Sequence, residues 1–352
     1  MKALIGMSVI IMIWMTSLIS CTSKDDFITI YRFPIVEELL HEKISTSPVL
    51  YAPVGLLLLD SAVVAMNLNT DTVFQVFKLP SYTHVGGFVR KGEGPDEELY
   101  IDPFIQRLEN NQFMYRNLTG VKFCDFNPFS ETLNIIKNIK LTNELIDVFH
   151  TFILNNQIIG TRTDKATDRE FVSFNIQTQR IDEYGEKFPI IKRRLRITDI
   201  DKVQLFAKAN TVKPDGSSFA CVYDKFPILR IYSNTGELKK DIRLNNNQQF
   251  PYALIEQEPT LEGVNEIMQN YRMIKSSNNY IYALYIGKRN KDISSGLNDF
   301  SNIIHVWDWE GNPIKELRLD RNIFTFDVSS DDKYIICSSL ELLDGFYKYV
   351  LI

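Results

Sequence analysis

The chain repeats one β pattern six times, and no other feature of the sequence restricts the fold as strongly. After residue 27, short runs of β-branched and aromatic residues alternate with turns that contain Asn, Asp, Gly and Pro, and a helical period of about 3.6 residues is almost absent. The clearest copy spans residues 206–244, where short turns at 214–216 (Pro-Asp-Gly) and 234–236 (Asn-Thr-Gly) separate apolar runs. This spacing predicts a four-stranded antiparallel meander.

The second strand of each copy is expected at a regular interval. The six predicted second strands are residues 56–59, 112–115, 157–160, 218–221, 280–283 and 334–337. Their mean spacing is about 56 residues, and six such repeats account for the chain after its first 20 residues. Six four-stranded sheets arranged radially form a β-propeller, in which each blade packs between its neighbours. The sequence therefore predicts an all-β fold with six four-stranded blades.

The last repeat, residues 324–352, contains only three predicted strands. The run at 27–32 (Phe-Ile-Thr-Ile-Tyr-Arg) has no partner of its own, and we expect it to supply the missing strand. Closing the ring in this way would also remove an exposed sheet edge. The predicted propeller domain is therefore residues 27–352.

Residues 91–98 read Lys-Gly-Glu-Gly-Pro-Asp-Glu-Glu and follow a β unit. They resemble the G-x-G-P-x-E element of six-bladed propeller lipoproteins of Gram-negative gut bacteria, which are related to TolB-like and NHL-repeat propellers. In this chain Asp96 replaces a further glycine of that element, and the aromatic residue after the acid is displaced to Tyr100. The other interpretation is a phosphate-binding loop, but no helix follows and no Lys-Ser or Lys-Thr pair ends the segment. A structural turn between blades is favoured.

An apolar stretch at residues 3–19 follows Lys2 and ends at Leu18-Ile19-Ser20-Cys21. It is short for a membrane span and is typical of a secretory signal, although an uncleaved anchor is the alternative. The last four residues resemble a bacterial lipobox, which implies a signal peptide at 1–20, lipidation of Cys21 and a linker at 21–26. Attached acyl chains would bind the protein stably to a membrane. We therefore expect an outer-membrane lipoprotein.

The segment directly after Cys21 bears on which side of the membrane the protein faces. Residues 22–26 read Thr-Ser-Lys-Asp-Asp and resemble the short export signals of surface lipoproteins, or else form a plain polar linker. A surface-exposed and a periplasmic position both stay open.

Composition excludes several classes of protein. The 352 residues are 45% hydrophobic and 24% charged, which is neither a disordered nor a collagen-like composition. A formal net charge of −5 argues against a nucleic-acid partner. Besides Cys21 there are three cysteines, and their apolar surroundings predict buried free thiols. They are Cys124, Cys221 and Cys337.

Four long segments interrupt the regular pattern of short turns: residues 81–100, 185–205, 245–270 and 287–301. Because strands alternate in direction, crossings between blades and loops between strands 2 and 3 share one face, and all four segments are assigned to that face. Long loops on a rigid scaffold usually carry binding, whereas neutral insertions would be scattered over both faces. The second segment contains the only dense basic cluster, which would meet an anionic ligand or lipid headgroups, or else is a solvated loop. The candidate residues are Lys192, Arg193, Arg194 and Arg196.

Catalytic and metal-binding patterns are scarce. The four histidines lack the H-x-x-x-H and H-E-x-x-H spacings, so no metal site is predicted. His150 lies in a predicted innermost strand and is the best candidate for lining the central channel, with a hydrogen-bonded structural histidine as the alternative. No catalytic residues can be assigned.

Together these patterns favour a lipid-anchored binding or interaction module with a protein, glycan or peptide partner and no cofactor. The alternative is a propeller hydrolase or lyase that resembles calcium-dependent lactonases, with a ring of Asp, Glu and Asn around the channel. The fold alone does not decide between them. Three or more such side chains converging in the channel would favour the enzyme, and an apolar or basic channel would favour binding.

Overall fold

The structure is a computed structural model that describes residues 27–47, 50, 53–94, 97–164, 167–190, 198–256, 260–293 and 300–351. Cys21 and the rest of 1–26 lie outside the described residues, as do Lys192, Arg193, Arg194 and Arg196. Lipidation of Cys21, the domain boundaries and the role of the basic cluster therefore stay predictions. In the described part of the chain, no helix is long and apolar enough to cross a membrane.

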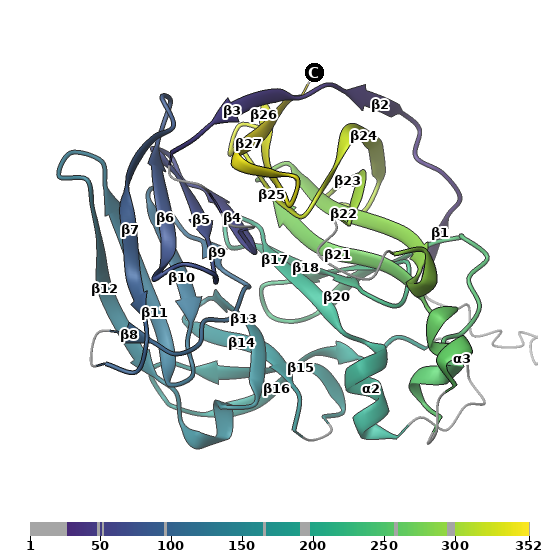
Figure 1. The fold of residues 1–352 in the computed structure, drawn as a ribbon. Coiled ribbons are helices and arrows are strands. Elements are labelled where there is room, and N and C mark those ends of the chain that lie inside the picture. Colours follow the sequence, from purple (N-terminus) through teal and green to yellow (C-terminus); the bar gives the residue numbers. More distant parts are fainter. Residues whose placement is uncertain are drawn as a thin grey trace, which may run out of the picture.

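Six sheets surround a central axis and form the blades of a propeller (Figure 1). Blade 1 consists of β4 (Gly55–Leu58), β5 (Ala62–Met66), β6 (Thr72–Lys78) and β7 (Thr83–Lys91), with the short β8 (Glu97–Glu98) on its outer edge. Blade 2 consists of β9 (Gln106–Arg107), β10 (Gln112–Arg116), β11 (Gly120–Asn127) and β12 (Thr132–Lys140). Blade 3 consists of β13 (Val148–Leu154), β14 (Gln157–Arg162), β15 (Arg169–Asn175) and β16 (Ile181–Lys187).

The other three blades follow the same order from the axis outward. Blade 4 consists of β17 (Lys208–Val212), β18 (Ser218–Tyr223), β19 (Ile228–Ser233) and β20 (Leu238–Leu244). Blade 5 consists of β21 (Met268–Ser276), β22 (Tyr280–Arg289), β23 (Ser301–Asp308) and β24 (Pro313–Ile323). Blade 6 consists of β25 (Thr325–Val328), β26 (Tyr334–Ser339) and β27 (Leu342–Val350). The all-β six-bladed propeller predicted from the repeats is confirmed.

The first blade differs from the prediction in two places. The run at 56–59 overlaps the innermost strand β4, and the second strand is β5, because the chain reverses at Asp60-Ser61, where Leu59 N–H donates to Ala62 O at 2.8 Å. The segment 81–100, expected to be a crossing, contains the outermost strand β7 and then β8. Its glycines and polar residues resemble a loop in sequence, because an outermost strand has little apolar surface to bury.

The ring is closed by an N-terminal strand, but not by the predicted one. Residues 27–32 contain β1 (Ile28–Ile30), which pairs in parallel with β20 of blade 4, and β2 (Val36–Leu39) pairs in parallel with β24 of blade 5. The strand that completes blade 6 is β3 (Glu42–Ser45), antiparallel to β27. Only β3 is close enough to β4 in sequence to lead directly from blade 6 into blade 1. The first segment of the described chain thus crosses the outer edges of three blades (Figure 1).

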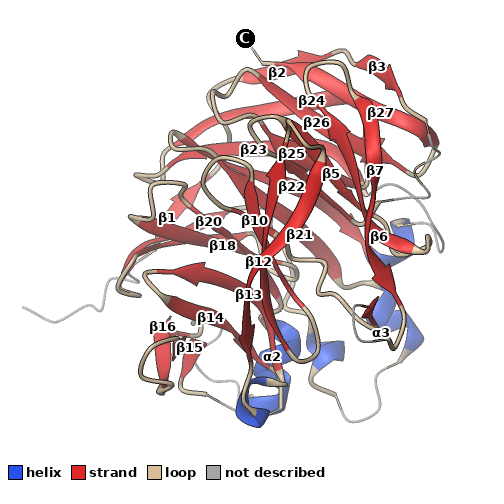
Figure 2. Ribbon diagram, turned by 90° about the vertical axis from the view of Figure 1, so that its left-hand side faces the viewer, coloured by secondary structure: helices blue, strands red, loops and turns tan. Residues whose placement is uncertain are grey.

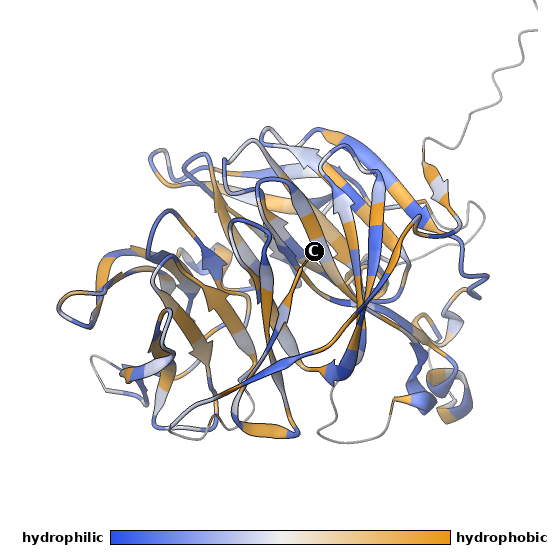
Figure 3. Ribbon diagram, turned by 90° about the horizontal axis from the view of Figure 1, so that it is seen from above, coloured by the Kyte–Doolittle hydropathy of each residue, from blue (hydrophilic) through white to orange (hydrophobic). Residues whose placement is uncertain are grey.

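The core lies between neighbouring blades. In blade 4, Phe219 and Tyr232 stack with ring centroids 4.7 Å apart, and Phe219 also contacts Phe152 and Phe171 of blade 3. Such aromatic pairs contribute beyond the area that they bury. Figure 3 shows apolar residues concentrated along the strands of the blades.

The three cysteines of the described chain are free and buried, as predicted: Cys124, Cys221 and Cys337. Burial raises the pKa of Cys124 and of Cys221 to about 12, so these thiols stay protonated at neutral pH. They behave as small apolar side chains in the strands that carry them.

Short helices gather on one face of the propeller (Figure 2). Helix α2 (Asp199–Leu205) contacts η2 (Tyr252–Leu254), and α3 (Leu261–Asn265) contacts both η2 and η3 (Asn290–Asp292). These elements belong to three of the four long segments, so the prediction that they share a face is confirmed for those three. We call this surface the long-segment face, and the opposite one the short-turn face.

The contact that closes the ring can be tested at Gly345, which pairs with Ser45 of β3. A methyl group on Gly345 would lie 2.1 Å from the carbonyl oxygen of Ile44. Gly345→Ala should therefore lower the free energy of unfolding by about 1–3 kcal/mol, because the backbone of β3 has to move. The measurement is urea unfolding, with Gly86→Ala as control, since a methyl group there comes no closer than 3.7 Å to Phe88. Equal stability of the two variants would contradict closure through β3.

Candidate functional site

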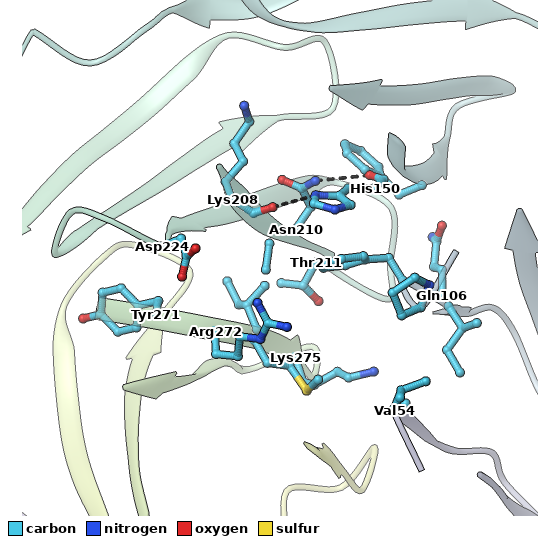
Figure 4. Close-up of a pocket in the computed structure, with 18 of the residues that line it drawn as sticks. Val54, Gln106, His150, Lys208, Asn210, Thr211, Asp224, Tyr271, Arg272 and Lys275 are labelled. Atoms are coloured by element: carbon cyan, nitrogen blue, oxygen red, sulfur yellow. Dashed lines mark hydrogen bonds between the residues drawn. The ribbon is translucent and has the colours of Figure 1, made fainter. Parts of the chain in front are cut away.

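A cavity of about 370 Å³ lies on the propeller axis (Figure 4). Its walls come mainly from the innermost strands β13, β17 and β21 and from residues that precede β9 and β25. Most of the lining is apolar, and its aromatic residues include Phe104, Phe300 and Phe324. A concave, largely apolar site with a few polar groups is the usual form of a small-ligand pocket.

Arg107 closes the axis at the short-turn face. Its Nη1 donates to the carbonyl oxygens of Leu58 in blade 1 and Val328 in blade 6, both at 3.0 Å, and its Nη2 donates to Ser276 O in blade 5 at 3.0 Å. Arg107 itself belongs to blade 2, and all four residues end an innermost strand. A guanidinium that reaches three other blades has to lie at the centre of the ring.

The cavity opens on the opposite, long-segment face. Gly55 begins β4, and Ala207 and Phe324 directly precede β17 and β25, so these lining residues lie where innermost strands start. Asp224 and Phe300 lie in connections between strands 2 and 3 and also line a second hollow of about 310 Å³ beside η3. The long segments therefore surround the open end of the axial cavity.

His150 lies on β13 and lines the cavity, in the innermost strand where the sequence analysis expected it. The pairing of β13 with β14 is irregular between Phe149 and Phe152, and His150 has a left-handed backbone with φ of 53°. Bulges of this kind redirect side chains and are frequent next to functional sites. Phe104 lies beside the imidazole, with ring centroids 3.9 Å apart.

The hydrogen bonds of His150 define its tautomer. Nδ1 lies 3.0 Å from the carbonyl oxygen of Lys208, which can only accept, so Nδ1 carries the proton. Burial lowers the pKa of His150, which keeps the ring neutral near pH 7 and leaves Nε2 as an acceptor. His150 is thus a hydrogen-bonded structural histidine, as the alternative interpretation expected. Contact between His150 and a ligand stays a prediction.

Arg272 and Lys275 bring cationic groups to the cavity from β21. Arg272 occupies an irregularity in the pairing with β22, between Tyr271 and Met273, and its Cζ lies 4.9 Å from the ring centroid of Phe300. Lys275 Nζ donates to Leu56 O at 3.0 Å, and burial lowers its pKa. Sequence analysis missed both residues. A bulge has no recognisable sequence pattern, and an isolated Arg in a strand is usually expected to face solvent.

Two carboxylates near the axis, those of Asp102 and Asp327, accept hydrogen bonds from backbone N–H groups. Asp102 accepts from the backbone N–H groups of Phe104 and His150 at 3.0 and 2.9 Å. Asp327 accepts from those of Leu58 and Val328 at 2.7 and 2.9 Å. Asp102 thus connects blades 2 and 3, and Asp327 connects blades 6 and 1. Neither carboxylate lines the cavity.

The described residues do not fit a calcium site in the channel. Ca²⁺ takes about six to eight oxygen ligands, usually with several carboxylates. In the cavity lining, Asp224 is the one carboxylate, and it is paired with Lys225 at 3.0 Å. The side-chain amides are those of Asn210 and Gln106. No group of three or more His, Cys, Asp or Glu residues in the described part of the chain could hold a metal ion.

The glycine-rich element at 91–98 acts as a connection between blades. In β8, Glu98 is buried and accepts from Tyr115 Oη at 3.1 Å and Asn117 Nδ2 at 2.6 Å, and it forms an ion pair with Lys122. Tyr115 and Lys122 belong to strands of blade 2, and Asn117 lies in the turn between its strands β10 and β11. The interpretation as a structural turn between blades is supported, and the phosphate-binding alternative is not.

Comparison with known families agrees with this geometry. The family described as "TolB-like 6-blade propeller-like" matches residues 37–331. The chain belongs to this family. The TolB-like part of the expected resemblance is thereby confirmed, while the lipoprotein part stays a prediction.

Two solved structures show the same fold. One is a member of the DUF4221 family from Bacteroides vulgatus, with a TM-score of 0.62, 12% sequence identity and coverage of 93% of this chain and 98% of the other. The second is a putative exported protein from Bacteroides fragilis, with a TM-score of 0.54, 12% identity and coverage of 93% and 99%. At this identity the likeness concerns the fold alone. No curated protein matches the chain significantly.

The closed end of the axis gives a testable expectation. Arg107→Met should lower the free energy of unfolding by about 2–4 kcal/mol, because buried carbonyl groups of three blades lose a charged donor. The measurement is urea unfolding, with Arg180→Met as control, since Arg180 is 74% exposed and pairs with Asp182 in its own blade. A loss no greater than that of Arg180→Met would contradict the role of Arg107 in holding the blades together.

Proposed function

We propose that this protein is a binding module of the cell envelope that takes a small ligand into the axial cavity from the long-segment face. The observation that carries this proposal is the asymmetry of the channel. Arg107 closes one end through hydrogen bonds to three blades, while the other end is surrounded by the long segments that contain α2, α3 and η3. Binding sites are common where variable loops meet a rigid scaffold.

The envelope location rests on the N-terminal sequence. The lipobox-like Leu18-Ile19-Ser20-Cys21 motif supports an outer-membrane lipoprotein anchored through Cys21. The structural likeness to a Bacteroides fragilis protein described as putatively exported is consistent with that location. In this proposal a lipid anchor tethers the propeller to the membrane. The ligand is a small molecule or a part of a protein, glycan or peptide partner that enters the cavity.

The basic cluster of Lys192, Arg193, Arg194 and Arg196 remains a candidate contributor. It precedes α2 in the sequence, and in this proposal its positive charge contributes to binding of the ligand. A solvated loop is still the alternative for these four residues.

The enzyme alternative receives less support from the site. Its calcium-binding ring requires converging oxygen ligands, whereas the described lining is mostly apolar, with Arg272, Lys275, Lys208 and His150 as its basic residues. Binding is therefore the function that this geometry favours.

Filling the mouth of the cavity tests the proposed site. Ala207 is half-buried in the lining, so Ala207→Trp should block entry while the blade still folds. The neutral dye N-phenyl-1-naphthylamine serves as a probe for the apolar lining, and its fluorescence enhancement should fall at least tenfold in the variant. Glu310→Trp adds the same indole to an exposed turn on the short-turn face and should leave dye binding unchanged. Undiminished dye binding by Ala207→Trp would contradict the proposed site.

Membrane attachment is tested separately at Cys21. Cys21→Ala should prevent incorporation of radiolabelled fatty acid and leave the protein unprocessed or released from membranes, because the thiol is the expected acylation site. The measurement is labelling together with the mass of the mature protein in a Gram-negative host. Acylation of the variant at wild-type level would rule out the lipobox interpretation.

A further inference from the structure

Arg272 is a cation at the open end of the cavity. In the described residues no carboxylate lies within ion-pair distance of its guanidinium, whereas Arg230 and Arg243 of the neighbouring blade both pair with Asp241. Arg272 is exposed, and its guanidinium lies over the face of Phe300. It lines both the axial cavity and the adjoining hollow beside η3. Its planar set of N–H donors is therefore available where a ligand would enter.

Nearby carboxylates do not neutralise this charge. Asp224, which also lines both spaces, is paired with Lys225 at 3.0 Å. Asp102 and Asp327 each accept from two backbone N–H groups and lie behind the lining. The surface that a ligand meets thus has an excess of positive charge, and Lys275 adds to it deeper in the cavity.

The rest of the lining suits an apolar body with a hydrogen-bond donor. Phe300 and Phe324 stack with centroids 4.9 Å apart, and Phe104 covers the imidazole of His150. Asn210 donates to His150 O at 3.3 Å, but its buried Oδ1 has no hydrogen-bond partner in the described chain. Figure 4 shows Asn210 and His150 on one wall of the cavity and Arg272 across from them. Buried acceptors without a donor are costly unless a ligand satisfies them.

The backbone supports the assignment of these residues to one site. His150 and Arg272 both occupy irregularities in innermost strands, β13 and β21, where the regular alternation of side chains is broken. Such bulges re-aim side chains and are common beside binding sites. Two separate strands thus direct polar groups into the same cavity.

We propose that the axial cavity binds an organic anion, in which a carboxylate, sulfonate or phosphate group pairs with Arg272 and an aromatic or aliphatic body lies against Phe104, Phe300 and Phe324. Guanidinium binds such oxyanions through paired, charge-assisted hydrogen bonds. This inference rests on the proposed binding function and names the ligand class for the same site.

Two dyes that differ by one sulfonate group provide the test. 8-Anilinonaphthalene-1-sulfonate carries a sulfonate on the same ring system as the neutral N-phenyl-1-naphthylamine. Wild type should bind the sulfonate more tightly than the neutral dye in a fluorescence titration. Arg272→Gln should weaken sulfonate binding by roughly tenfold or more, the size expected for a lost charge-assisted hydrogen bond, and change neutral dye binding less than about twofold. Arg272→Lys should retain part of the preference, because it keeps the charge but not the planar donors.

Controls separate this inference from the proposed function itself. Arg180→Gln removes an exposed arginine outside the cavity and should change neither titration. If Ala207→Trp removes binding of both dyes while Arg272→Gln affects both equally or neither, the cavity is a binding site but the anion assignment is wrong. If wild type binds neither dye, or if Ala207→Trp still binds both, the proposed site and the ligand class are both overturned.

Discussion

The guanidinium of Arg107 is the interaction on which the centre of the ring depends. A propeller has no continuous core through its axis, since each blade packs only against its neighbours. Arg107 connects blade 2 to blades 1, 5 and 6 through three carbonyl groups, all at 3.0 Å. Because these carbonyls terminate innermost strands, the same contact stabilises the ring and seals one end of the channel. In the part of the chain that the structure describes, the short-turn face is closed, and the long-segment face is then the only route into the axial cavity.

Buried carboxylates repeat this connecting role between neighbouring blades. Glu98 from the edge of blade 1 bonds Tyr115 and Lys122 of blade 2, and Glu170 of blade 3 bonds Tyr223 and Arg230 of blade 4. A buried charge is tolerated only when its partners are in place. Each of these pairs therefore fixes the arrangement of two neighbouring blades, and its net contribution to stability is small. The glycine-rich element recognised in the sequence is one of these connections, because its Glu98 bonds blade 2.

The sequence predicted the repeat well because periodicity and turn chemistry are local. Five of the six predicted second strands overlap observed ones, and the exception occurs where two apolar strands, β4 and β5, are separated by a short turn at Asp60. The sequence analysis assigned the N-terminal strand at 27–32 to the wrong blade. The strands β1 and β2 pair in parallel with the outermost strands of blades 4 and 5, and such pairing leaves no pattern in the sequence. His150 could be assigned to the channel from its position in an innermost strand. Arg272 could not, because its orientation depends on a bulge.

The character of the cavity follows from how the fold uses its acids. The chain carries more acidic than basic residues, 44 against 39, yet the axial lining is basic. Asp102 and Asp327 are bound by backbone amides that connect adjacent blades, and Asp224 is paired with Lys225. Since those carboxylates connect blades, Arg272 on the bulged strand β21 faces the cavity with no ion-pair partner among the described residues. A scaffold that has to join six blades at its axis thereby leaves positive charge at its open end, and selectivity for anions follows from the same contacts that hold the ring together.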